Sequence, residues 1–138
     1  MTAPAISDLR AIALAAELEG REILARYTDT ELRLIYNRLG PDSFPAWLRN
    51  AISDLNRWAE PGALIHDADW KESDGTREGF DASNARLRLN LIKLAKYLYG
   101  WADPRRYVCI LRARRFAAYC QAFGYSAWRR DAEKNPPS

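Results

Sequence analysis

The chain has 138 residues, of which 48% are hydrophobic and 28% are charged, and its formal net charge is +3. Domains commonly hold roughly 100–200 residues, and this balance of apolar and charged residues is far from that of a disordered chain. The sequence therefore predicts one folded domain with its own core. The charge is uneven, because residues 102–138 hold 8 basic and 3 acidic residues, or 8 − 3 = +5. Such a segment attracts phosphate groups of lipid or nucleic acid, or forms a solvated helix face.

Residues 1–59 are predicted to form three helices. The first runs from Ser7, its N-cap, to about Tyr27. The second covers residues 31–39, after a Thr-Asp-Thr cap and before a Gly-Pro stop. The third begins near residue 42 and is expected to end at the Glu-Pro-Gly stretch of residues 60–62.

The first 20 residues predict an amphipathic helix, because charged residues interrupt the apolar run. A secretory signal would need an uninterrupted apolar region followed by a cleavage site. No stretch reaches the ~18 apolar residues of a membrane span. We therefore expect the chain to be made in the cytoplasm.

The centre of the chain is expected to differ from its flanks. Residues 63–70 form a short apolar and then acidic segment, and residues 71–79 are polar, with a turn signal at Asp74-Gly75. The polar residues 71–79 are therefore predicted to form a flexible loop.

Two long antiparallel helices are predicted to follow. The first covers about residues 81–99, with leucines repeating at spacings of four, three and four. The second begins at Asp103-Pro104 and runs to Phe123, with Gly124 as its stop. Its apolar side is expected to consist largely of four residues, namely Val108, Leu111, Phe116 and Tyr119.

The predicted fold class is all-α, because no run of residues has the alternation of a strand. Residues 1–128 are expected to form a single helical domain, made of N-terminal helices in 1–59 and a core in 60–128, and residues 129–138 a disordered tail. Cys109 and Cys120 lie about 16 Å apart along one predicted helix, too far for a disulfide. We expect both thiols to be buried and reduced.

The most chemically suggestive point of the sequence is its only histidine, His66, which directly precedes Asp67. Histidine suits general base catalysis near neutral pH, because its ordinary pKa is about 6.5. On a helix, adjacent side chains point about 100° apart, so His66 and Asp67 would face different groups. That arrangement suits a base and a cation ligand on either side of one reacting water. A core or capping role for His66 explains the same residue.

Residues 60–128 resemble the phospholipase A2 superfamily, through a family of phage and bacterial proteins. The shared pattern is a His-Asp-x-x-Tyr helix, here with Trp70 in place of Tyr, then a second long helix and an ending of the form Gly-x-x-x-Trp, here at Gly124 to Trp128. The resemblance implies a phage- or prophage-associated, virion-associated protein that hydrolyses lipid esters with Ca²⁺. Residues 1–59 have no counterpart in the resemblance.

By this resemblance, His66 would deprotonate the attacking water and Asp67 would bind Ca²⁺. Asn90 or Asp81, on the next helix, would orient the imidazole. The partner would be a phospholipid or membrane surface. The family's glycine-rich calcium loop has no clear equivalent before His66. The alternative is therefore a non-catalytic phage structural, assembly or partner-binding protein that keeps the helical core.

Two other interpretations use residues outside this pair. The acidic residues of positions 67–74 could bind a metal, but the spacing does not follow the EF-hand pattern, so a solvated acidic loop is the favoured explanation. Arg105, Arg112 and Arg115 fall near one helix face and could follow phosphates of a nucleic acid. No DNA-reading motif accompanies them, and the N-terminal half is net acidic, which argues against nucleic acid as the partner.

Overall fold

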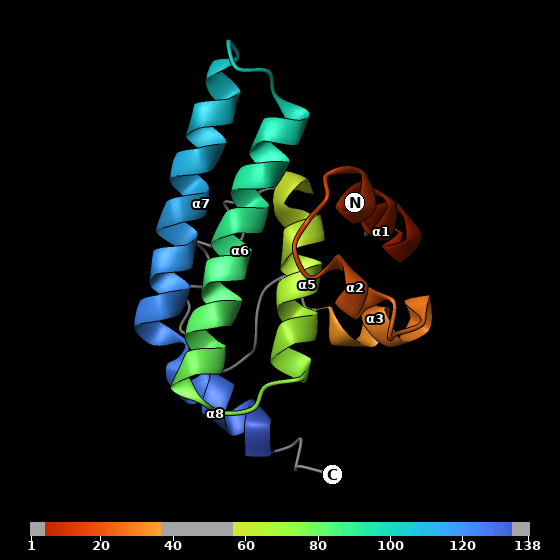
Figure 1. The fold of residues 1–138 in the computed structure, drawn as a ribbon, viewed down its shortest axis with the longest axis vertical. Coiled ribbons are helices and arrows are strands. Elements are labelled where there is room, and N and C mark those ends of the chain that lie inside the picture. Colours follow the sequence, from red (N-terminus) through yellow and green to blue (C-terminus); the bar gives the residue numbers. More distant parts are fainter. Residues whose placement is uncertain (1–4, 37–56, 134–138) are drawn as a thin grey trace.

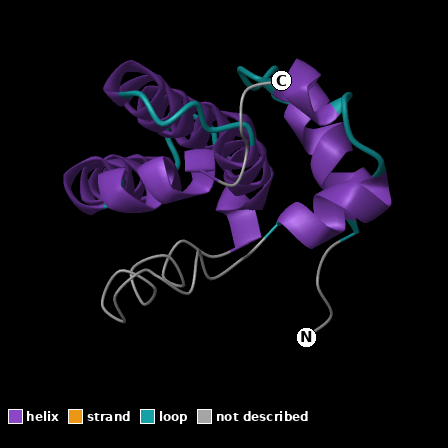
Figure 2. Cartoon of the chain, turned by 90° about the horizontal axis from the view of Figure 1, so that it is seen from below, coloured by secondary structure: helices purple, strands orange, loops and turns teal. Residues whose placement is uncertain are grey.

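The structure is a computed structural model that describes residues 5–36 and 57–133. Every regular element in these two ranges is a helix, as Figure 2 shows, and this confirms the predicted all-α class. The elements are, in chain order, α1 (Ile6–Ala15), α2 (Arg21–Leu24), α3 (Asp29–Ile35), the short 3-10 helix η1 (Arg57–Ala59), α5 (Glu60–Lys71), α6 (Arg77–Leu98), α7 (Pro104–Phe123) and α8 (Tyr125–Glu133). None of the described helices is long and apolar enough to cross a membrane.

The centre of the fold is the hairpin formed by α6 and α7, which run antiparallel side by side (Figure 1). Both helices begin where the sequence offers a cap: the Thr76 hydroxyl accepts from Gly79 N, and the Asp103 carboxylate accepts from Arg105 N. Pro104 occupies the first turn, where its missing N–H costs no hydrogen bond. The predicted pair of long C-terminal helices is confirmed, with α6 starting four residues earlier than expected.

The predicted first helix is wrong as a single element, because the chain turns between α1 and α2. Glu17 and Gly20 both have positive φ values, 54° and 88°, which no helix contains. Asn90 of α6 holds this turn: its Oδ1 accepts from Glu19 N and its Nδ2 donates to Glu19 O, both at 2.8 Å. The turn therefore depends on a residue 71 positions further along the chain. By contrast, the cap predicted before the second helix is present, as a reciprocal pair between Thr28 and Glu31 at the start of α3.

Residues 60–71 form the helix α5, which agrees with the helix that the resemblance implied around His66, whereas the helix end predicted at residues 60–62 is wrong because α5 begins there. Pro61 lies in the first turn of α5, where proline is tolerated. Gly62 serves the contact with α6, because a Cβ at this position would lie only 3.0 Å from Leu91 Cδ2. The predicted turn is confined to residues 72–76, where Gly75 has a φ of 74°. The predicted helix that begins near residue 42 and the end of the predicted second helix fall outside the described residues.

The main core lies where α5 and α6 meet α1, α2 and α7, and it contains Leu64, Leu91 and Leu94. A second, aromatic cluster lies where α8 crosses the lower end of the hairpin, and it contains Trp70, Phe80 and Trp128. Because α8 continues to Glu133, the tail predicted from residue 129 is wrong for residues 129–133; residues 134–138 lie outside the described ranges.

The buried face of α7 is rotated from the predicted one. Val108 and Leu111 are exposed, at 47% and 65%, whereas Phe116 is buried and Tyr119 packs against the aromatic cluster. The buried stripe consists mostly of small residues, namely Cys109, Ala113, Phe116, Ala117 and Cys120. Small side chains let α7 approach α6 closely, which explains why the larger ones face outward. Both cysteines are free and buried, as predicted.

Candidate functional site

Helix α5 carries the His66-Asp67 pair, so the two side chains leave one helix in different directions, as the sequence analysis expected. His66 points inward and is only 9% exposed. Its ring lies beside Trp70, one turn later, at a centroid distance of 5.5 Å and a tilt of 55°. The imidazole is therefore part of the packing between α5 and the aromatic cluster.

The hydrogen-bond partner of the imidazole is Ser83 of α6, whose Oγ lies 3.3 Å from His66 Nδ1. Burial lowers the pKa of His66 from 6.5 to about 4, and an interaction with the backbone of Ser83 opposes this only in part. The ring is consequently neutral at pH 7. A hydroxyl can hold the ring in place but, unlike a carboxylate, does not stabilise the imidazolium that forms when a base takes a proton.

Asn90 and Asp81, the two residues expected to orient His66, bind other groups. Both polar ends of the Asn90 amide are engaged by the backbone of Glu19. Asp81 is exposed, accepts from Gln121 Nε2 at 2.6 Å and pairs with Arg77. The structure therefore uses Asn90 to fasten the N-terminal helices and Asp81 to fasten α7.

Asp67, the predicted calcium ligand, is half-buried. Its charge contributes to the raised pKa of Cys120, which burial brings to about 12. Calcium takes six to eight oxygen ligands, several of them carboxylates. Within residues 5–36 and 57–133, no group of three or more histidine, cysteine, aspartate or glutamate side chains is arranged to hold a metal ion. Calcium binding by Asp67 therefore stays a prediction.

The acidic residues after Asp67 each have their own partner. Asp69 pairs with Arg86 at 2.7 Å, and burial raises the pKa of Asp69 to about 6, although the charge of Arg86 lowers it. Glu72 accepts hydrogen bonds from Arg26 and Tyr27, each at 2.7 Å. Asp74 accepts from the backbone and hydroxyl of Thr76. These bonds join α5 to α6, join the segment after α2 to the end of α5, and shape the turn before α6, so the acidic residues serve packing between elements.

Comparison with protein-family models, with curated proteins and with solved structures found no match for this chain. The resemblance to the phospholipase A2 superfamily and the association with phage therefore stay predictions.

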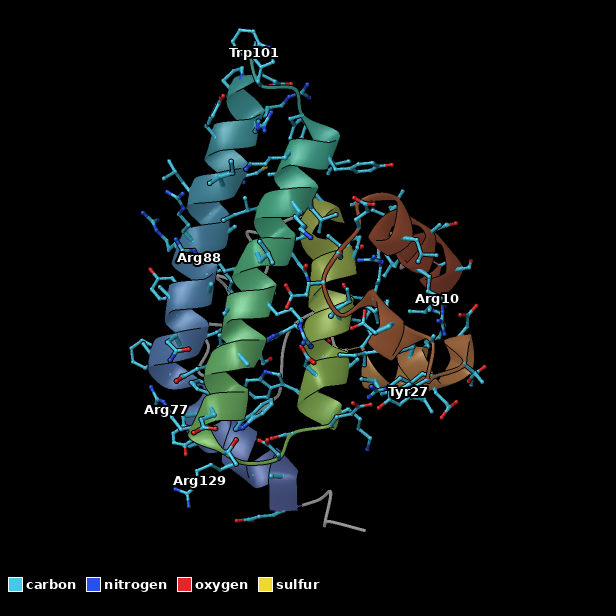
Figure 3. The ribbon with its side chains drawn as sticks, in the orientation of Figure 1. Arg10, Tyr27, Arg77, Arg88, Trp101 and Arg129 are labelled. Carbon is cyan, nitrogen blue, oxygen red and sulfur yellow. The ribbon has the colours of Figure 1, made fainter. Side chains whose placement is uncertain are left out.

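A second candidate surface is the outer side of the α6–α7 hairpin, of which only the basic residues of α7 were expected from the sequence. Residues 77–123 hold 10 basic and 3 acidic residues, so the hairpin carries 10 − 3 = +7, while the remaining 11 basic and 15 acidic residues give −4. Five basic side chains of the hairpin are exposed and form no ion pair with another described residue, namely Arg88, Lys96, Arg112, Arg114 and Arg115. Arg88 projects outward from the hairpin in Figure 3.

Large apolar side chains share this surface toward the loop that joins the two helices. Six of them are between 44% and 79% exposed, namely Tyr97, Leu98, Trp101, Tyr107, Val108 and Leu111. We call this group the hairpin tip. Trp101 is the most exposed of the six and lies at the far end of the hairpin (Figure 3). The available sequence signal was the spacing of 107, 108 and 111, which fits one helix face but does not say whether that face is inside or outside.

Proposed function

We propose that this protein is a non-catalytic binding protein whose α6–α7 hairpin docks on an anionic partner. The observation that carries the proposal is the coincidence of charge and exposed apolar area on one hairpin. The hairpin has a net charge of +7, five of its basic side chains are exposed without an ion pair to another described residue, and the hairpin tip exposes six large apolar residues. Exposed apolar groups rimmed by cations are typical of interaction surfaces.

The surroundings of His66 support the same proposal. A general base must reach the proton that it abstracts, whereas His66 is buried beside Trp70 and bonded to Ser83. Asn90 and Asp81 hold the fold together at other points. In this proposal α5 is the central packing helix that supports the hairpin.

A pair of double charge reversals tests the proposal. Arg112→Glu with Arg115→Glu changes the charge of the hairpin by −4, and Arg33→Glu with Arg130→Glu changes the total charge equally on exposed residues of α3 and α8. We expect only the hairpin variant to elute from immobilised heparin at much lower salt, because local charge governs contact with a polyanion. Equal shifts for the two variants would show that overall charge, and not the hairpin, governs binding.

The lipid ester hydrolase is the second candidate, and the observation in its favour is that His66 and Asp67 do lie on one helix packed against α6. Phospholipid vesicles with and without Ca²⁺, exposed to the wild type and to His66→Ala, separate the two functions. Calcium-dependent release of fatty acid that is absent from a folded His66→Ala variant would establish the hydrolase. The binding proposal expects no release from either protein.

A further inference from the structure

Apolar and basic side chains follow one another along one exposed face of α7, and this sequence of residues suggests what the hairpin tip contacts. Tyr107, Val108 and Leu111 lie on one face of the helix, three and four residues apart. The same face continues with Arg112 and Arg115. One exposed stripe is therefore apolar over the first ~10 Å of α7 and cationic beyond it.

The loop between the helices adds aromatic surface and is held in a defined conformation. Trp101 is 79% exposed, and its carbonyl accepts a hydrogen bond from the Tyr107 hydroxyl. Asp103 caps α7, and its carboxylate also binds the Arg105 guanidinium at 2.7 Å. Arg105 in turn lies over the Tyr99 ring at 4.7 Å.

These contacts remove the one feature that would oppose an anionic partner. Asp103 is the only acidic residue between positions 82 and 123, and Arg105 pairs with it. The remaining charges near the tip are basic. The bound guanidinium and the cap together hold the pKa of Asp103 below its ordinary value, so the carboxylate stays ionised and paired.

Shape and composition distinguish between the kinds of anionic partner. Tryptophan and tyrosine combine an apolar ring with a polar group and favour the boundary between lipid and water, while arginine beside them binds lipid phosphates. The loop with Trp101 is the projecting end of the molecule, and the other five residues of the hairpin tip lie on the adjoining turns of α6 and α7 (Figures 1 and 3). A projecting end suits contact with a broad, flat surface, whereas a nucleic acid strand is usually followed along a groove.

We propose that the hairpin tip binds the surface of an anionic phospholipid bilayer. Trp101, Tyr107 and Leu111 contact the interface, and Arg112 and Arg115 contact the headgroup phosphates. This inference rests on the proposed function and names the partner of that surface. Apolar contact gives the adhesion, and cations select membranes that carry negative charge.

The test uses the full chain and sedimentation with vesicles of phosphatidylcholine alone or mixed with phosphatidylglycerol. We expect binding to the mixed vesicles only, and weaker binding as salt is added. Leu111→Ser and Leu34→Ser are a matched pair, because both leucines are exposed on helices, at 65% and 83%. Leu111→Ser should bind roughly tenfold more weakly, and Leu34→Ser should bind as the wild type does.

Further variants separate the contribution of the basic residues from that of the apolar residues, and tryptophan fluorescence gives an independent measurement of binding. Arg112→Glu with Arg115→Glu should weaken binding roughly tenfold or more, with no loss from Arg33→Glu with Arg130→Glu. Trp101→Phe identifies the tip directly: the blue shift of tryptophan emission that vesicles cause in the wild type should be largely lost.

The outcomes distinguish this inference from the function on which it rests. Equal vesicle binding by Leu111→Ser, Leu34→Ser and the wild type would overturn the lipid inference. Absence of vesicle binding, with Arg112-dependent binding to duplex DNA or to polyglutamate, would also overturn it while keeping the hairpin as a docking surface for a nucleic acid or an acidic protein. No hairpin-dependent binding to vesicles, DNA, polyglutamate or heparin would overturn both proposals.

Discussion

The two ends of the α6–α7 hairpin are both rich in aromatic residues, but helices cover only one of them (Figure 1). At the lower end, Trp70 of α5 and Trp128 of α8 pack against Phe80 of α6. At the upper end, the loop leaves Trp101 and Tyr107 in solvent. The same residue types therefore stabilise the fold at one end and are available for a partner at the other. Whether an aromatic residue is buried or exposed depends on whether another helix packs over that end of the hairpin. The composition of the hairpin alone does not predict this.

The largest expected effect on the free energy of unfolding comes from a matched pair of tryptophan substitutions, one at each end of the hairpin. Trp128 is 4% exposed, and its Nε1 donates to Thr76 O at 2.9 Å. Trp128→Ala should lower the free energy of unfolding by about 3–5 kcal/mol, because it leaves a cavity and removes the hydrogen bond to Thr76 O. Trp101→Ala should change it by no more than about 0.5 kcal/mol.

Chemical denaturation of the two variants measures both values. Equal destabilisation would mean that Trp101 is part of a core and that the upper end is not a free surface. A small effect at Trp128 would mean that α8 contributes little to covering the lower end.

Local signals predicted the hairpin well because its boundaries depend on neighbouring residues. Asp103, Pro104 and Gly124 act within one turn of the positions where α7 begins and ends. The break between α1 and α2 could not be predicted in this way. Its Glu19 backbone is held by Asn90, and no local pattern reports a contact between residues so distant in sequence.

In the candidate site, too, local sequence signals predicted one part of the arrangement and missed another. The sequence placed His66 and Asp67 on different sides of one element, which follows from helix geometry alone. The partner of His66 proved to be Ser83, seven residues before Asn90 on the same helix. That choice depends on how α5 and α6 pack, and packing of this kind is set by small contacts such as Gly62 against Leu91.

The pH dependence of the free energy of unfolding tests whether His66, near the lower end of the hairpin, is buried in a packed interior. The pKa of His66 is about 4 in the folded chain and about 6.5 when exposed, so between these values the unfolded state binds the extra proton. Stability should fall as the pH drops through this window, by about 3 kcal/mol at full effect, and the contribution is constant above it. His66→Gln, which can still bond with Ser83, should remove this dependence.

Asp69 serves as an internal check, because its linkage has the opposite sign. Its folded pKa is raised to about 6, so the folded state binds the extra proton and stability should fall as the pH rises from about 4 to 6. The relevant quantity is therefore the difference between the unfolding curves of the wild type and His66→Gln across this range. Parallel curves would show that His66 titrates as an exposed residue and is accessible enough for the catalytic role.

The smallest expected effects compare hydrogen bonds at the two ends. Gln121 accepts from Asn84 Nδ2 at 2.9 Å and donates to Asp81 Oδ1 at 2.6 Å, and Asn84 is buried. Gln121→Ala should lower the free energy of unfolding by about 1–2 kcal/mol, because the buried amide loses its partner. Tyr107→Phe removes a bond at the exposed tip, where water can replace the hydroxyl, and should cost about 0.5 kcal/mol or less.

The two variants should also differ in their effect on vesicle binding. Comparing stability with binding in both variants is therefore a stronger test than either free energy of unfolding alone. Gln121→Ala should leave binding through the hairpin tip intact in the fraction that remains folded, because its contacts lie at the covered end. Tyr107→Phe keeps the ring but frees the Trp101 carbonyl and loosens the loop, so it should weaken binding more than it weakens the fold. Measuring unfolding and vesicle binding on both variants checks this reversal. If Tyr107→Phe proved the more destabilising of the two, the tip would be a structural element and the contrast between the ends would fail.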